Sequence, residues 1–167
     1  MAILEILTIP DPRLKTVAKE VAEVTDHTRK ILDDLLETML EEGGVGLAAT
    51  QANIHERMFV MDVSTGKNEP IHFINPRIIE TFGELEMEEG CLSIPGIYAK
   101  VTRPQKLTVH YLDYHGKPAE MTVEGYAAKC IHHEIDHLNG VVFLDHLSPL
   151  KRKMLEPKLK KLAKHKA

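Results

Sequence analysis

Apolar residues first recur at helical spacing near the start of the chain. Ile31, Leu35 and Met39 lie four positions apart and would line one face of a helix. Thr25 precedes this run as a candidate N-cap, because its hydroxyl can accept a hydrogen bond from the first turn. Two glycines follow the run and favour its end. The pattern therefore predicts a helix from Thr25 to about residue 42.

Helical periodicity returns in the second half of the chain. Residues 124–138 are predicted to form a helix that stops at the Asn-Gly pair after them. Ser148 and Pro149 suit the N-cap and first position of a last helix. Pro157 lies inside that helix and is expected to kink or restart it, because proline removes one helical hydrogen bond.

Between these helices the apolar runs are short and bounded by turn residues, a pattern typical of strands. A turn at residues 113–116 makes the last two strands a plausible hairpin. Without regular βαβ alternation, the order predicts an α+β fold. We expect antiparallel strands around the helix at 124–138, with an N-terminal helix and a C-terminal basic helix. The predicted strands cover residues 57–63, 71–74, 107–112 and 121–123.

The charge is divided unevenly along the 167 residues. The net charge of −4 does not predict a protein that binds specific DNA. Residues 148–167 nevertheless carry eight Lys or Arg side chains and one acidic residue, whereas residues 1–147 carry 13 basic and 24 acidic residues. We expect one domain over residues 1–147, followed by a basic helical tail at 148–167.

The sequence also bears on cellular location. Its apolar runs are too short to span a membrane, and its first residues do not resemble a secretory signal. Cys91 and Cys130 could form at most one disulfide. A reducing cytoplasm is therefore the expected compartment, with no membrane partner.

The strongest chemical signal is the sequence His133-Glu134-Ile135-Asp136-His137. Two His residues four positions apart lie on one face of a helix, so both imidazoles can bind one metal ion. The adjacent Glu134 can act on water at that metal. We expect residues 1–147 to form a metal-dependent catalytic domain.

Two His ligands call for a third, and the sequence offers several candidates. Glu156 stands 19 residues after His137 but among lysines, and His146 is closer in sequence. The better candidate is Cys91, whose thiolate is a strong ligand for borderline and soft divalent metals. Cys130 is the rival thiol, although a buried cysteine more commonly serves as a small apolar residue.

A third segment combines small residues with an amide. It runs from Gly44 to Gln51 and reads GVGLAATQ. Small residues permit close packing around a site, and the Gln51 amide can donate a hydrogen bond to a developing oxyanion. The plainer alternative is a tight turn followed by a buried strand.

Together, GVGLAATQ, EGCLSIPG and HHEIDHLNG, in this order, resemble the motifs of peptide deformylases of the short bacterial form. The resemblance implies a metal site formed by Cys91, His133 and His137, with Glu134 as general acid and base. It implies that Gln51 and the backbone N–H of Leu92 bind the oxyanion and that Gly46 lines the site. It also implies Fe²⁺ as the cofactor, with Ni²⁺, Co²⁺ or Zn²⁺ able to substitute; the residues alone suggest zinc.

Two residues depart from the family pattern. Residue 132 is His where the family usually has Gln, and residue 129 is Lys where it is usually apolar. In the family this helix face lines the pocket for the methionine side chain, so Lys129 would border that pocket or make it more polar. The expected pocket residues are Val45, Met87, Tyr126, Lys129 and Cys130.

The function implied is removal of the N-formyl group from the N-terminal methionine of nascent formyl-methionyl polypeptides, with release of formate. The basic tail would dock on the ribosome, or serve only as a solvated helix face. A zinc endopeptidase built on the same His-Glu-x-x-His helix is one alternative. A structural metal module that binds RNA through the tail is another, and it would need a closed site of four ligands.

Overall fold

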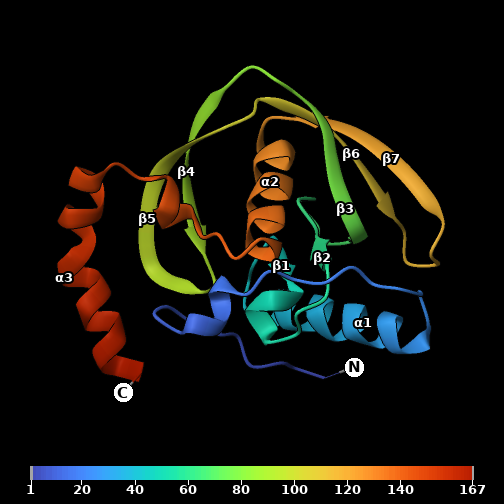
Figure 1. The fold of residues 1–167 in the computed structure, drawn as a ribbon, viewed down its shortest axis with the longest axis horizontal. Coiled ribbons are helices and arrows are strands. Elements are labelled where there is room, and N and C mark those ends of the chain that lie inside the picture. The colour runs from blue at the N-terminus through green and yellow to red at the C-terminus, as the bar shows by residue number, and fades with distance from the viewer. Residues whose placement is uncertain (1, 167) are drawn as a thin grey trace.

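A computed structural model describes residues 2–166 and has an α+β architecture (Figure 1). Its three α-helices are α1 (Asp26–Glu41), α2 (Tyr126–Leu138) and α3 (Pro149–Lys166). Short 3₁₀ helices cover Pro12–Lys15, Ala49–Ala52 and Phe143–His146. The strands are β1 (Gly46–Ala48), β2 (Met58–Met61), β3 (Ile71–Phe82), β4 (Leu85–Cys91), β5 (Ile94–Arg103), β6 (Lys106–Leu112) and β7 (Pro118–Glu124).

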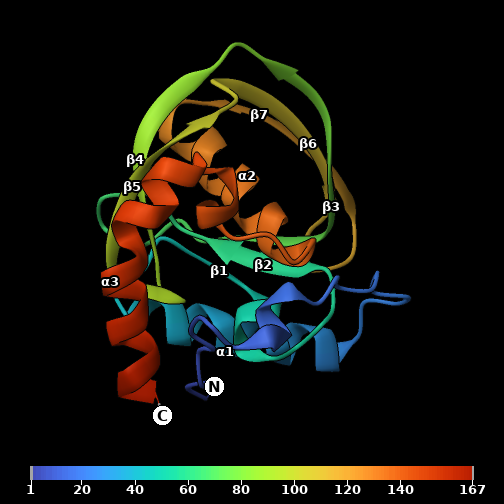
Figure 2. The same cartoon turned by 60° about the vertical axis from the view of Figure 1, so that its left-hand side comes forward.

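The predicted N-terminal helix is confirmed as α1, with Thr25 at its N-cap. Its apolar face is buried because Leu32, Leu35 and Met39 pack into a cluster with Met58 and Val60 of β2. Fully burying one such side chain stabilises the fold by about 1.5–3 kcal/mol. Figure 2 shows α1 lying beneath β1 and β2, where it supports the strand that leads into the site.

Five strands form an antiparallel sheet in the order β1-β2-β3-β6-β7. The predicted hairpin of β6 and β7 is confirmed. β3 is much longer than its predicted range of 71–74. The full length of β3 was not predicted because Pro76, which has no N–H to donate to a neighbouring strand, indicated an end of the strand. The pairing with β6 instead continues past it with a register shift between Ile74 and Arg77. Asn75, at φ 50°, instead binds the backbone of Val21 through its side chain.

β4 and β5 form a separate two-stranded sheet that the sequence analysis missed. β4 and β5 are joined directly by Leu92 and Ser93, which places Cys91 at the end of β4. The long β4–β5 hairpin curves beside α2, opposite β3 and β6 (Figure 1). The two sheets thus enclose α2 between them.

α2 lies at the centre and is buried on two sides (Figure 2). Ala128, Ile131, Ile135 and Leu138 follow helical spacing and pack into the cluster under the larger sheet. The helix ends at Asn139, and Gly140, at φ 74°, follows. A Cβ at Gly140 would stand 2.4 Å from the Lys15 carbonyl oxygen, so only glycine fits.

The last helix, α3, begins at Pro149 as predicted and does not restart at Pro157. Pro157 lies inside this one continuous helix although it has no backbone N–H to donate. Leu155, Leu159 and Leu162 pack against a cluster that contains Ile94 and Ile97 of β5. Within residues 2–166, no helix combines the length and the hydropathy needed to cross a membrane.

Candidate metal centre

Cys91, His133 and His137 converge between β4 and α2. Cys91 is the last residue of β4, and the two histidines lie one turn apart on α2. Their candidate ligand atoms all lie within 4.8 Å of one another. Cys91 Sγ is 3.3 Å from His137 Nε2, which is 3.2 Å from His133 Nε2. Tetrahedral ligands with bonds of about 2.0–2.3 Å stand roughly 3.3–3.6 Å apart, so this donor set fits one divalent metal ion.

Glu89 orients His133 from the side opposite the cluster. Its Oε1 lies 2.7 Å from His133 Nδ1, and Arg103 donates to both of its oxygens at 2.7 and 2.9 Å. Burial alone would raise the pKa of Glu89, but its hydrogen bonds with Arg103 and His133 lower that pKa to about 2. The carboxylate is therefore ionised and accepts the Nδ1 proton, which leaves His133 Nε2 free to bind a metal.

Glu134 lies beside the cluster in a space that glycine creates. Its side chain is buried, and Oε1 has no hydrogen-bond partner among the described residues. A Cβ on Gly46 would stand 2.5 Å from Glu134 Oε2, so any larger residue would displace the carboxylate. Burial raises the pKa of Glu134 to about 7, in the range suited to a group that takes up and gives back a proton.

Gln51 is held with its amide NH₂ toward the cluster. Its Oε1 accepts from the backbone N–H of Ala48 at 2.9 Å, which fixes the orientation of the amide. Nε2 then lies 3.0 Å from Ser93 Oγ and 3.6 Å from Cys91 Sγ. The segment at 46–52 is therefore a short strand and a 3₁₀ turn that present a fixed donor.

Comparisons with known proteins agree on one family. The family model described as "Polypeptide deformylase" matches residues 3–153. A peptide deformylase of Azotobacter vinelandii is 54% identical over 162 residues, which cover 96% of each chain. The chain belongs to the peptide deformylase family.

Solved structures of the family share this fold closely. A peptide deformylase from Legionella pneumophila superposes with a TM-score of 0.93 at 47% identity, covering 99% of this chain and 98% of that one. The Ehrlichia chaffeensis enzyme, in complex with actinonin, gives 0.91 at 42% identity, with 96% and 98% covered. The chain is thus a deformylase in both sequence and fold, and this family is one of metalloenzymes.

A cleft of about 390 Å³ opens beside the cluster of this deformylase. Of the expected pocket residues, Val45, Gly46 and Tyr126 line it, together with Gln51 and Leu92. Tyr98 also lines the cleft and was not expected from the sequence. Its polar and apolar walls suit an extended peptide with one apolar side chain.

Three expected pocket residues do not line this cleft within the described part of the chain. Cys130 is buried in the cluster under the larger sheet, and Met87 is half-buried on β4. Lys129 places Nζ 4.3 Å from the centre of the Tyr126 ring and 3.5 Å from the Glu88 carbonyl oxygen. Lys129 therefore stands behind a residue of the cleft wall.

The rival ligands lie away from the cluster. Cys130 is in the core, and Glu156 is exposed on α3. His146 bonds to Asp136 instead. Glu89 is part of the Glu-Gly-Cys motif, but its role beside His133 was not predicted. Its partner Arg103 could not be predicted from local sequence, because Arg103 is 14 residues from Glu89 and comes next to it only through the β4–β5 hairpin.

Proposed function

We propose that Cys91, His133 and His137 hold one divalent metal ion at which this deformylase removes the N-formyl group. The substrate would be a newly made polypeptide that begins with formyl-methionine, and formate would be released. The observation that carries the proposal is the convergence of one thiol and two imidazoles within 4.8 Å, beside a cleft. We further propose Fe²⁺ as the native metal, with Ni²⁺, Co²⁺ or Zn²⁺ as substitutes.

Glu134 is proposed as the group that moves protons. When bound, the metal would supply Lewis-acid chemistry, which lowers the pKa of water and polarises a carbonyl group. Glu134 would take up the proton of the attacking water and pass it to the leaving amine nitrogen. Its buried, unpartnered Oε1 and its pKa near 7 support this role.

The side-chain amide of Gln51 and the backbone N–H of Leu92 are proposed to donate hydrogen bonds to the formyl oxygen as it gains negative charge. The Gln51 amide is already held by Ala48 and Ser93, so little reorganisation is needed. Leu92 follows Cys91 in the tight turn between β4 and β5 and lines the cleft. Gly46 leaves the space in which Glu134 faces the substrate.

Formate release tests the proposal directly. Protein purified without oxygen should release formate from formyl-Met-Ala-Ser, and Cys91→Ala should abolish both metal content and turnover. Cys130→Ala is the matched control and should keep both. A Cys91→Ala protein with full metal content and undiminished cleavage of internal peptide bonds would instead support a zinc endopeptidase that uses another ligand.

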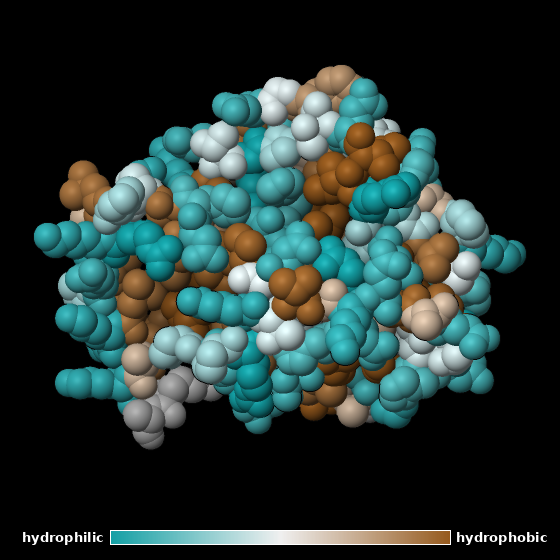
Figure 3. Space-filling model, viewed as in Figure 1, coloured by the Kyte–Doolittle hydropathy of each residue, from teal (hydrophilic) through white to brown (hydrophobic). Residues whose placement is uncertain are grey.

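The C-terminal segment supports a further proposal about partners. We propose that residues 148–167 form a basic tail on a catalytic body of residues 1–147, and that the tail docks on the ribosome in the cytoplasm. Figure 3 shows hydrophobic residues between α3 and the body and hydrophilic ones along the outer side of α3. The exposed basic side chains of α3 include Lys151, Arg152, Lys153, Lys158, Lys160, Lys161 and Lys164.

Salt dependence distinguishes docking from simple solubility. Contacts with phosphates release counterions, so ribosome binding should weaken with salt at a log–log slope of about −0.9 per phosphate, as for duplex DNA. Deletion of residues 153–167 should abolish this binding while the folded remainder still hydrolyses short formyl peptides. If the folded, truncated protein binds ribosomes with unchanged salt dependence, the tail does not dock.

A further inference from the structure

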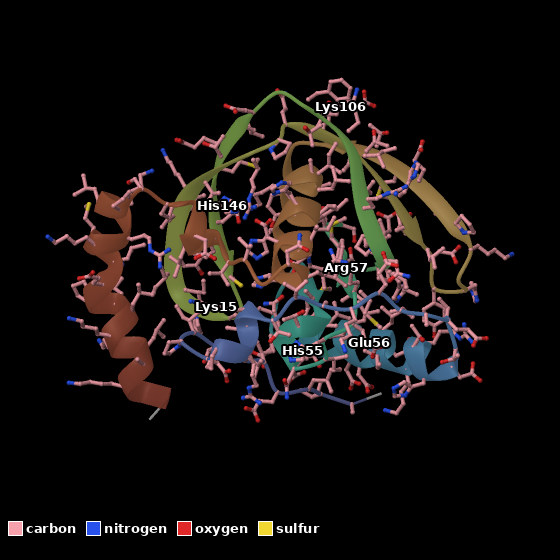
Figure 4. The ribbon with its side chains drawn as sticks, viewed as in Figure 1. Lys15, His55, Glu56, Arg57, Lys106 and His146 are labelled. Carbon is pink, nitrogen blue, oxygen red and sulfur yellow. The ribbon has the colours of Figure 1, made fainter. Side chains whose placement is uncertain are left out.

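A continuous line of polar contacts leads from the protein surface to the metal ligand His133. It starts at His146 in the 3₁₀ helix Phe143–His146, between β5 and α2 (Figure 4), and passes through Asp136, Arg103 and Glu89. The exposed fraction of the side chains falls inward, from 35% at His146 and 15% at Asp136 to 1% at Arg103 and Glu89. Only the outer end of the line is therefore open to solvent.

The direction of each hydrogen bond follows from the groups involved. A guanidinium can only donate, so Arg103 Nε and Nη2 donate to Glu89, and Nη1 donates to Asp136 Oδ2 at 2.5 Å. The same Asp136 oxygen accepts from His146 Nε2 at 2.7 Å. Glu89 accepts the proton on His133 Nδ1. Each side chain in the line is therefore hydrogen-bonded to the side chain that lies nearer the protein surface.

Arg103 Nη1 has a second acceptor in His132, whose Nδ1 lies 2.9 Å away. His132 is on α2 next to the ligand His133 but points toward Arg103 and not toward the cluster. Two histidines that belong to no metal site in the described residues therefore surround the Arg103–Asp136 pair. This arrangement gives a structural place to His132 and His146, neither of which has a role in the proposed chemistry.

We propose that His146 is a positioning residue for the metal ligand His133. It holds Asp136 against Arg103, so that Arg103 keeps Glu89, and Glu89 keeps the His133 ring, in the orientation that binds the metal. Without His146, Asp136 can turn toward solvent and leave Arg103 Nη1 without its charged partner in a buried site. The inference rests on the proposed metal centre.

Metal release provides a readout that does not depend on turnover. His146→Ala, loaded with Co²⁺, should release the metal to excess chelator about tenfold faster than the wild type, at the lower end of the range for outer groups around metal ligands. The Co²⁺ absorption bands should also shift, because the His133 ring changes orientation. His146→Gln can still donate from Nε2 and should restore both the rate and the spectrum.

A matched control separates positioning from general destabilisation. His110 also bonds to a carboxylate, Glu120, but on β6 and β7 beside a different cavity, so His110→Ala should release Co²⁺ at the wild-type rate. His146→Phe keeps a ring without a donor and replaces His146→Ala if that variant does not fold.

Some results would contradict the positioning role of His146, and others would contradict the metal centre on which it rests. Release within twofold of the wild type and an unchanged spectrum in the folded variant would refute the positioning role, as would equal acceleration in His110→Ala. If the wild type fails to bind one Co²⁺, or Cys91→Ala binds it equally well, the proposed metal centre itself is wrong.

Discussion

Glu134 is the residue that we propose moves protons during turnover. Its carboxylate is buried beside the cluster and has no partner for Oε1 among the described residues. Glu134→Gln keeps the shape but cannot carry the proton, so kcat should fall by about 10²–10⁴-fold while the metal content stays at one per chain. Formate release and metal analysis test this. More than a tenth of the wild-type kcat would contradict the proposed role.

Gln51 offers a second test at the residue scale. Its amide is fixed by Ala48 and Ser93 and should bond best to the oxygen in the transition state. Gln51→Leu should therefore lower kcat by about 10²–10³-fold and change KM much less. Steady-state kinetics with formyl-Met-Ala-Ser separate the two constants. An effect on KM alone would exclude Gln51 from binding the oxyanion.

Lys129 lies behind the cleft wall, with its ammonium group over the Tyr126 ring. Lys129→Met should therefore leave the preference for methionine over norleucine or alanine substrates within about twofold, while costing about 0.5–1 kcal/mol of stability from the lost cation–π contact. The ratio of kcat/KM values measures the preference. A tenfold change, about 1.4 kcal/mol, would place Lys129 in the pocket.

Among the elements, those with local signals were predicted best. α1 and α2 follow from apolar residues at helical spacing, and the β6–β7 hairpin follows from its turn. β4 and β5 were missed because β4 lacks a buried apolar face. Its one buried residue is the charged Glu89, and its other residues are exposed or half-buried. Their pairing follows from tertiary packing beside α2, which overrides weak strand propensity.

The connection between β2 and β3 gives a prediction about pH. Asp62 accepts hydrogen bonds from Ser64 N and Oγ at 3.0 and 2.5 Å and from Glu69 N at 3.2 Å. Burial alone would raise the pKa of Asp62, but these bonds, together with Lys67, lower it. Because the folded pKa is below the unfolded value, the stabilisation is present above pH ~4 and is lost as the pH falls through the folded pKa.

Asp62→Asn should accordingly lower the free energy of unfolding by about 1–2 kcal/mol at pH 7, because one acceptor is lost. The difference from the wild type should shrink as the pH falls below ~4 and Asp62 becomes protonated in the wild type. Urea unfolding at pH 7, 5 and 3 measures it. A difference that is the same at all three values would show that the Asp62 charge contributes nothing.

At the scale of the whole molecule, the cluster joins the β4–β5 hairpin to the central helix. A metal that binds only the folded state stabilises it by about 2.7 kcal/mol at 100 times its Kd. Removing the metal should therefore lower Tm by roughly 5–10 °C for a chain of this size. Calorimetry before and after chelation tests this. Cys91→Ala is the control, and an equal shift in that variant would place the stabilising metal elsewhere.

The amino-acid sequence establishes which chemical groups are present and predicts the relations between residues that are close along the chain. His133 and His137 share a helix face because they are four residues apart, and that relation needs no other part of the chain. Only the tertiary structure decided which thiol joins them, because Cys91 is 46 residues before His137 and Cys130 is on the same helix. The tertiary structure also brings Arg103 to Glu89, which bonds to His133, and His146 to Asp136. It leaves Lys129 outside the cleft. These contacts connect separate elements and depend on how α2 is enclosed by the strands.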